Sequence, residues 1–194
     1  MRSMIIFLLF FLFVTTNCFS QEEIDVTNVT RLTILSPGIS YEKRIGKRQT
    51  LKFNAVMALS AYWGDSEFFG STSGIHFDPS LGIEYRYYYN GAARGSKGKR
   101  TERNSLNYFG AVHRSLFVKR QDYDTMYSKS DFRLFNTVGI VWGLQRNYHN
   151  RISLDLNAGL GYVYGKDLYQ STDWIQRLST IISVELGFWL NKRK

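Results

Sequence analysis

The feature that most constrains this chain is a two-residue alternation of apolar and polar side chains, which recurs in segments from residue 49 to the C-terminal region. Successive side chains of a β-strand point to opposite faces of the sheet, so each such segment is predicted to be a strand with one apolar and one polar face. In 152–165 the apolar set is Ile152, Leu154, Leu156, Ala158, Leu160, Tyr162 and Tyr164, against Ser153, Asp155, Asn157, Gly159, Gly161 and Gly165. The alternation predicts an all-β fold.

Eight strands account for the chain. They are predicted at 26–35, 39–46, 49–63, 77–89, 104–119, 132–147, 151–165 and 178–190. The first two are expected to form a hairpin at Ser36-Pro37-Gly38, because proline fixes φ at one central turn position and glycine accepts a positive φ at the next. A single strand kinked at Pro37 is the alternative. Short turns are expected at 45–48 and 147–151, and longer polar links at 64–77, 90–104, 120–131 and 165–177.

The polar face of these strands does not have the composition of a water-exposed sheet surface. Glycine recurs on it at positions 82, 139, 143, 159, 161 and 187, beside single charged residues. Glycine destabilises an exposed strand, whereas inside a narrow barrel small residues make room for large charged ones. The polar face is therefore predicted to line the lumen. An internal ion-pair network is expected between Glu42, Glu84, Asp155 and Glu185 and the cations Arg44, Lys52, Arg86 and Arg133.

The apolar face carries aliphatic residues in mid-strand and aromatic residues toward the strand ends: Trp63, Tyr87, Tyr89, Tyr162, Tyr164 and Phe188. Aromatic girdles on both sides of an aliphatic band are typical of a transmembrane β-barrel. The pattern predicts a closed, antiparallel, up-and-down transmembrane β-barrel of eight strands, in which side chains fill the lumen. A soluble exported barrel or sandwich is the alternative, because exchanging the two faces leaves the alternation unchanged.

The first 20 residues match a secretory signal peptide. Arg2 precedes an apolar run at 4–14, and Cys18 and Ser20 lie three and one positions before a cut ahead of Gln21. The run is too short to cross a bilayer as a helix. Lipid modification of Cys18 is the alternative, although Asn17 stands where a small residue is expected before it. Residues 21–194 are predicted to form one β-barrel domain without cysteine.

These features together resemble the small outer-membrane β-barrel proteins of Gram-negative bacteria. The resemblance rests on the signal peptide, on the segment 40–47 leading into an alternating strand, and on the final strand 185–190. It implies location in the cell outer membrane, contact with outer-membrane lipids and lipopolysaccharide, and recognition of the final strand by the outer-membrane assembly machinery. The chain departs from the family by ending on Asn191-Lys192-Arg193-Lys194 rather than on an aromatic residue. A monomer is expected.

One motif suggests an enzyme. His113 and Ser115 lie two residues apart, so they share a strand face, and a histidine can activate a serine hydroxyl. Outer-membrane lipid A deacylases are similar barrels that use a His-x-Ser pair, followed by an Asn where this chain has Leu116. In 104–119 the alternation puts Leu106, Tyr108, Val112, Leu116 and Val118 on the apolar face, and Asn107, Ala111, His113, Ser115 and Lys119 on the polar face. His113 and Ser115 are therefore expected to point inward, away from lipid, and no catalytic residue is assigned.

The remaining polar features favour binding or a structural role. Arg94, Lys97, Lys99, Arg100 and Arg103 form a basic segment that suits anionic lipid phosphates or periplasmic polymers, and export argues against nucleic acid as a partner. Aromatic residues in the long links are candidates for a binding surface with an unknown partner: Trp63, Phe68, Phe69, Tyr123, Tyr127, Tyr169 and Trp174. No cofactor or metal site is predicted. The expected function is a non-catalytic outer-membrane barrel with an envelope-structural or surface-binding role, and the alternatives are a lipid-modifying enzyme or a soluble lipocalin-like carrier.

Overall fold

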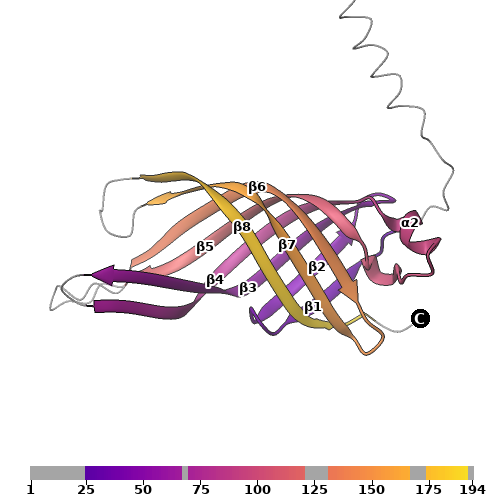
Figure 1. Ribbon diagram of the computed structural model, residues 1–194, viewed down its shortest axis with the longest axis horizontal. Helices are drawn as coiled ribbons and strands as arrows, with labels where there is room; N and C mark the ends of the chain where they lie inside the picture. Colours follow the sequence, from indigo (N-terminus) through magenta and orange to yellow (C-terminus); the bar gives the residue numbers. More distant parts are fainter. Residues whose placement is uncertain (1–24, 67–69, 121–130, 167–173, 192–194) are drawn as a thin grey trace, which may run out of the picture.

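The computed structural model describes residues 25–66, 70–120, 131–166 and 174–191, with side chains omitted at some of the strand ends that border the gaps. These residues form a closed antiparallel barrel in which each strand pairs with its neighbours in sequence and β8 pairs with β1 (Figure 1). The strands are β1 Val29–Thr33, β2 Gly38–Arg44, β3 Gln49–Ser66, β4 Gly70–Tyr88, β5 Asn107–Arg120, β6 Asp131–Asn147, β7 Ile152–Lys166 and β8 Trp174–Trp189. The predicted eight-stranded, up-and-down barrel is confirmed.

The first two strands are a true hairpin, with Leu32 opposite Ile39, so the alternative of one kinked strand is wrong. The reason given for Gly38 is also wrong, because this glycine does not have a positive φ. Its backbone instead lies against β3: a Cβ at this position would stand 2.3 Å from the carbonyl oxygen of Ala55. Glycine is needed here because two strands approach closely, and not because of the turn.

Two of the expected links differ from the structure. β4 begins at Gly70, so most of the polar stretch expected as a loop at 64–77 belongs to β3 and β4. This stretch is rich in glycine, serine and threonine and has no regular alternation of apolar and polar residues, so the sequence pattern does not indicate a strand there. The link between β4 and β5 contains a short helix, α2 Gly91–Gly95, and a 3-10 turn, η1 Glu102–Asn104.

The barrel has its apolar side chains outside and its charged side chains inside. Ile140, Leu178 and Ile182 are each more than 70% exposed on the outer wall. Glu42 and Arg86, by contrast, are fully buried in the lumen. On the outer wall Tyr87, Phe109 and Trp142 are paired across three successive strands near the end that carries the C-terminus. The predicted assignment of the polar face to the lumen is therefore confirmed for β2, β3, β4, β6, β7 and β8.

The strands are strongly tilted (Figure 1). A row of paired residues that starts at Gln176 on β8 and is followed once around the wall returns to β8 at Phe188, 12 residues further along the strand. Such a stagger accompanies closure of a tilted sheet, and eight strands leave a lumen that side chains can fill.

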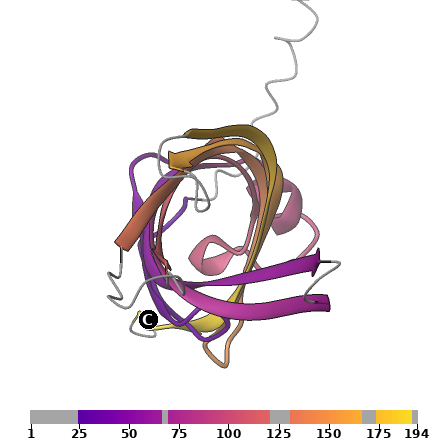
Figure 2. The ribbon, with the colours of Figure 1, turned by 90° about the vertical axis from the view of Figure 1, so that its left-hand side faces the viewer.

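The two ends of the barrel differ. α2 lies at one end, here called the closed end, and the last residues of β3, β5 and β7 lie at the other, here called the open end (Figure 1). Viewed from the open end, the segment between β4 and β5 is seen through the ring of strands (Figure 2). β3 and β4 stand away from the ring of strands at the open end (Figure 2).

Candidate functional site

The centre of the lumen is a carboxylate held by three donors from three strands. Asp155 on β7 accepts hydrogen bonds from Arg86 at 2.8 Å, from Lys52 at 3.2 Å and from the Tyr108 hydroxyl at 2.8 Å. Lys52 also donates to Glu185 at 2.7 Å. Arg86 further pairs with Glu84 at 3.1 Å. The network ties β3, β4, β5, β7 and β8 together across the lumen.

A second cluster surrounds Glu42 on β2. Its carboxylate pairs with Arg31 on β1 and accepts hydrogen bonds from the Thr50 hydroxyl at 2.7 Å and the Tyr88 hydroxyl at 2.5 Å. Arg31 lies 3.9 Å from Asp155, which links this cluster to the first. These groups are almost completely buried, so each charge depends on its partners rather than on water.

The predicted network is correct in most of its members. All four predicted carboxylates, Lys52 and Arg86 are buried in the lumen and paired. Arg44 was wrongly predicted: it lies outside, 40% exposed, and pairs with Asp25 at 2.9 Å. The Arg133 side chain lies outside the described residues. Arg31 was missed, because β1 has only five residues and therefore too little alternation to fix which of its side chains face inward.

Glycine makes room for the network as predicted. Gly143 on β6 faces the ring of Tyr108, and a Cβ at this position would stand 2.4 Å from its Cζ atom. The Arg86 guanidinium lies over the same ring, 4.1 Å from its centroid. The missing side chain at Gly143 thus allows Tyr108 to reach both Arg86 and Asp155.

The link between β4 and β5 caps the lumen at the closed end. Asn104 is buried, accepts a hydrogen bond from the Thr27 N–H at 2.7 Å and donates to the Thr27 carbonyl at 2.8 Å. The Arg103 carbonyl accepts hydrogen bonds from the Gln145 and Asn147 side chains of β6. The cap and the ion-pair network together fill this half of the barrel.

The two faces of β5 are exchanged relative to the prediction: the side chains predicted to face outward face the lumen, and those predicted to face the lumen face outward. Tyr108 and Val112 are buried inside, where they join an apolar layer with Val141 and Ile181. His113 is paired with Ile83 and Ser115 with Leu81, and both partners are exposed on the outer wall. The expectation that His113 and Ser115 point inward is therefore wrong. The lumen is not uniformly polar. Because β5 contributes apolar side chains to a layer inside the lumen, its apolar face was mistaken for an outer face.

The outward-facing serine has a partner, but it is not the histidine. The Ser115 hydroxyl donates to Asn136 Oδ1 on β6 at 2.8 Å. Among the described side chains no carboxylate bonds to His113. A histidine that activates a serine needs both a hydrogen bond to the hydroxyl and a group that orients the ring. The three residues form a small polar patch on an otherwise apolar wall.

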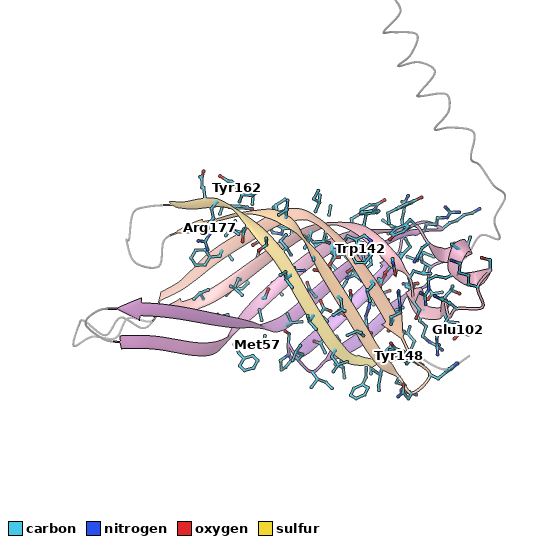
Figure 3. All side chains as sticks on the ribbon, viewed as in Figure 1. Met57, Glu102, Trp142, Tyr148, Tyr162 and Arg177 are labelled. Carbon is cyan, nitrogen blue, oxygen red and sulfur yellow. The ribbon has the colours of Figure 1, made fainter. Side chains whose placement is uncertain are left out.

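The basic segment lies around α2 at the closed end, where Figure 3 labels Glu102. Lys97 and Lys99 are exposed. Arg100 pairs with Glu102 at 3.0 Å, and Arg103 lies over the Trp189 ring at 3.9 Å. Of the candidate loop aromatics, Phe68, Phe69, Tyr123, Tyr127 and Tyr169 and the side chains of Trp63 and Trp174 lie outside the described residues.

In the described part of the chain no helix is long and apolar enough to span a bilayer. No group of three or more His, Cys, Asp or Glu side chains in the described ranges is placed to hold a metal ion. No family model, curated protein or solved structure matches the chain.

Proposed function

We propose that this chain is an outer-membrane β-barrel protein without catalytic activity, which serves the structure of the cell envelope or binds partners through the links at its open end. The single observation that carries the proposal is the inverted distribution of side chains. The outer wall exposes Leu, Ile, Val and aromatic residues on every strand from β1 to β8, while the lumen buries seven charged residues in one connected network.

Water would penalise so large an apolar surface, because soluble monomers rarely expose contiguous apolar patches above a few hundred Å². Hydrocarbon tolerates it, provided that the backbone is paired. The same distribution argues against a soluble carrier of the lipocalin type, whose lumen has to be apolar to hold a hydrophobic ligand. The signal peptide, which is a prediction from sequence, supports export across the inner membrane.

The test uses the full-length gene expressed in a Gram-negative host. We expect the mature chain to fractionate with the outer membrane and, when extracted in mild detergent, to migrate differently on a denaturing gel before and after boiling. Recovery of the folded chain in the soluble periplasmic fraction, with no need for detergent, would refute the proposal.

A second candidate function is favoured by one observation: His113 and Ser115 face outward, where a lipid ester could reach them. A lipid-modifying hydrolase needs its catalytic side chains to face lipid. The observed orientation meets this requirement, whereas the sequence pattern predicted that both side chains point inward. The hydrogen bond from Ser115 to Asn136 and the absence of a described carboxylate at His113 favour the non-catalytic function.

The two candidates are separated by incubating the purified barrel with lipid A and measuring released fatty acid. We expect no release above background from the native protein. Release that disappears in Ser115→Ala, but persists in the control Ser183→Ala on the luminal side of β8, would establish the hydrolase instead.

A further inference from the structure

Two arginines lie within range of each other's charge at the closed end of the barrel. Arg146 is the penultimate residue of β6, and Arg94 belongs to α2 in the link between β4 and β5. Arg94 is the ionisable group whose charge acts most strongly on Arg146. Neither guanidinium pairs with a carboxylate among the described residues. We call Arg94 and Arg146 the rim pair.

Neutral oxygen atoms hold the rim pair in place. Arg94 donates twice to the Arg100 carbonyl, at 3.0 Å and 3.3 Å. Arg146 donates three hydrogen bonds, to the carbonyl oxygens of Leu106 at 3.0 Å and Gln145 at 2.7 Å and to Asn107 Oδ1 at 2.7 Å. A guanidinium carries five N–H groups, so three of Arg94 and two of Arg146 have no acceptor in the described part of the chain. Two like charges with donors to spare are stabilised when an anion binds to both.

The rim pair lies beside the aromatic girdle. Trp142 on β6 is exposed on the outer wall (Figure 3) and donates to the Tyr89 hydroxyl at 2.8 Å. Arg146 follows Trp142 by four residues, so it is on the same outward face of the strand, closer to the closed end. The Tyr89 and Tyr148 hydroxyls also act on the charge of Arg146. Aromatic girdles mark the membrane interface, so we expect the rim pair at the depth of the lipid headgroups.

The link between β4 and β5 makes the surroundings of the rim pair positive. Residues 89–106 contain five basic residues and a single acidic one, Glu102. The Glu102 carboxylate is already engaged, because it pairs with Arg100 at 3.0 Å and with Arg103 at 3.4 Å. The field at this part of the rim therefore attracts anions.

The anion that fits this place is the phosphate of a phospholipid. The planar fork of an arginine matches two oxygens of a phosphate, and two arginines can share one phosphate group. Tyr89 accepts a hydrogen bond from Trp142, which leaves its own proton free to donate to a phosphate oxygen. Free phosphate offers the same chemistry, but the headgroup depth of the rim pair keeps lipid phosphates at its side. Short turns of outer-membrane barrels face the periplasm, and one of them, between β6 and β7, follows Arg146.

We propose that the rim pair binds the phosphate of an anionic phospholipid in the leaflet that faces the periplasm. The proposal rests on the proposed membrane location, and it adds a lipid site at the closed end to the partner binding proposed for the open end. A bound phosphate satisfies the spare N–H groups of both arginines and offsets the repulsion between them. It also attaches α2 to the lipid surface beside β6.

The experiment uses the mature chain, which is expected to contain no cysteine, so one cysteine can be labelled with a fluorophore. Ala158→Cys places the label on the outer wall beside Trp142, with which Ala158 is paired. The barrel is reconstituted in vesicles of phosphatidylcholine with a minor share of phosphatidylglycerol, and the chains of one lipid or the other are brominated. Quenching by each lipid, divided by its mole fraction, gives the preference of the wall for the anionic lipid. Heat-modifiable migration on gels verifies that each variant is folded.

We expect the native barrel to prefer phosphatidylglycerol, and each arginine to contribute about a fivefold preference, as for a basic residue near an anionic membrane surface. Arg94→Gln and Arg146→Gln should each lower the preference by about this factor. Because Arg146 also bonds to the backbone of the wall, Arg94→Gln alone decides the outcome where Arg146→Gln does not fold. Lys97→Gln is the matched control, since it removes the same charge from an exposed side chain of the same link, and it should leave the preference unchanged.

Three results would overturn the lipid site. The first is quenching that follows the mole fractions in the native barrel. The second is a loss in Lys97→Gln as large as that in Arg94→Gln, which would reduce the effect to the diffuse charge of the link. The third is no lipid preference together with Arg94-dependent binding of inorganic phosphate or of sedimented peptidoglycan in detergent, which would make the anion a soluble one or a periplasmic polymer. A label that neither brominated lipid quenches would contradict the membrane location itself.

Discussion

Asp155→Asn tests whether the buried network holds the barrel together. The substitution keeps the shape of the side chain but removes the charge that faces Arg86, Lys52 and the Tyr108 hydroxyl. An amide has one acceptor oxygen, and its NH₂ group would meet donors. Removing one partner from a buried ion pair costs about 3–5 kcal/mol, because the remaining charges stay buried without compensation.

Two matched carboxylate-to-amide substitutions test whether the loss of stability depends on the position in the lumen rather than on the removal of a charge. Glu185→Gln removes a carboxylate that, among the described side chains, accepts hydrogen bonds only from Lys52. Because Lys52 keeps its hydrogen bond to Asp155, we expect a cost of about 1–2 kcal/mol. Asp78→Asn alters a luminal carboxylate with which no cation pairs among the described residues, and its cost should stay within about 0.5 kcal/mol.

The assay is unfolding in urea of barrels refolded into bilayers, followed by tryptophan fluorescence, with the three variants compared with the native chain. The expected order of destabilisation is Asp155→Asn, then Glu185→Gln, then Asp78→Asn. The reasoning is refuted if Asp155→Asn unfolds at the native urea concentration, or if Asp78→Asn costs as much as Asp155→Asn.

Three further substitutions probe the wall, the packing and the cap. Val138→Arg on the outer wall, four residues along β6 from Trp142, should cost about 2–4 kcal/mol in a bilayer, as for an arginine near the midplane, and a negligible cost in urea unfolding would contradict contact with lipid. Gly143→Val should collide with Tyr108 and cost about 1–3 kcal/mol, measured in the same way, whereas no change would show that the ring has room to move. Asn104→Ala should remove both hydrogen bonds to Thr27 and expose the closed end to proteolysis in detergent; a cleavage rate equal to the native one would refute the capping role.

The sequence predicted the strands well because period-two alternation is a direct consequence of strand geometry. The predicted strand at 152–165 and its neighbours are long enough to show the alternation of apolar and polar residues clearly. The boundaries predicted for β6 and β7 therefore lie within one residue of the observed ones. The face of these strands that lines the lumen was also predictable, because glycine and isolated charged residues occur together on that face. Neither signal depends on tertiary contacts.

The prediction of which side chains face the lumen failed on strands whose orientation depends on contacts across the lumen. Tyr108 and Val112 are apolar yet inward, since the lumen contains an apolar layer that no single strand reveals. His113 and Ser115 are polar yet outward for the same reason. Arg44 is on the same face of β2 as the luminal Glu42, but it is the last residue of the strand, and its side chain pairs with Asp25 instead of joining the network.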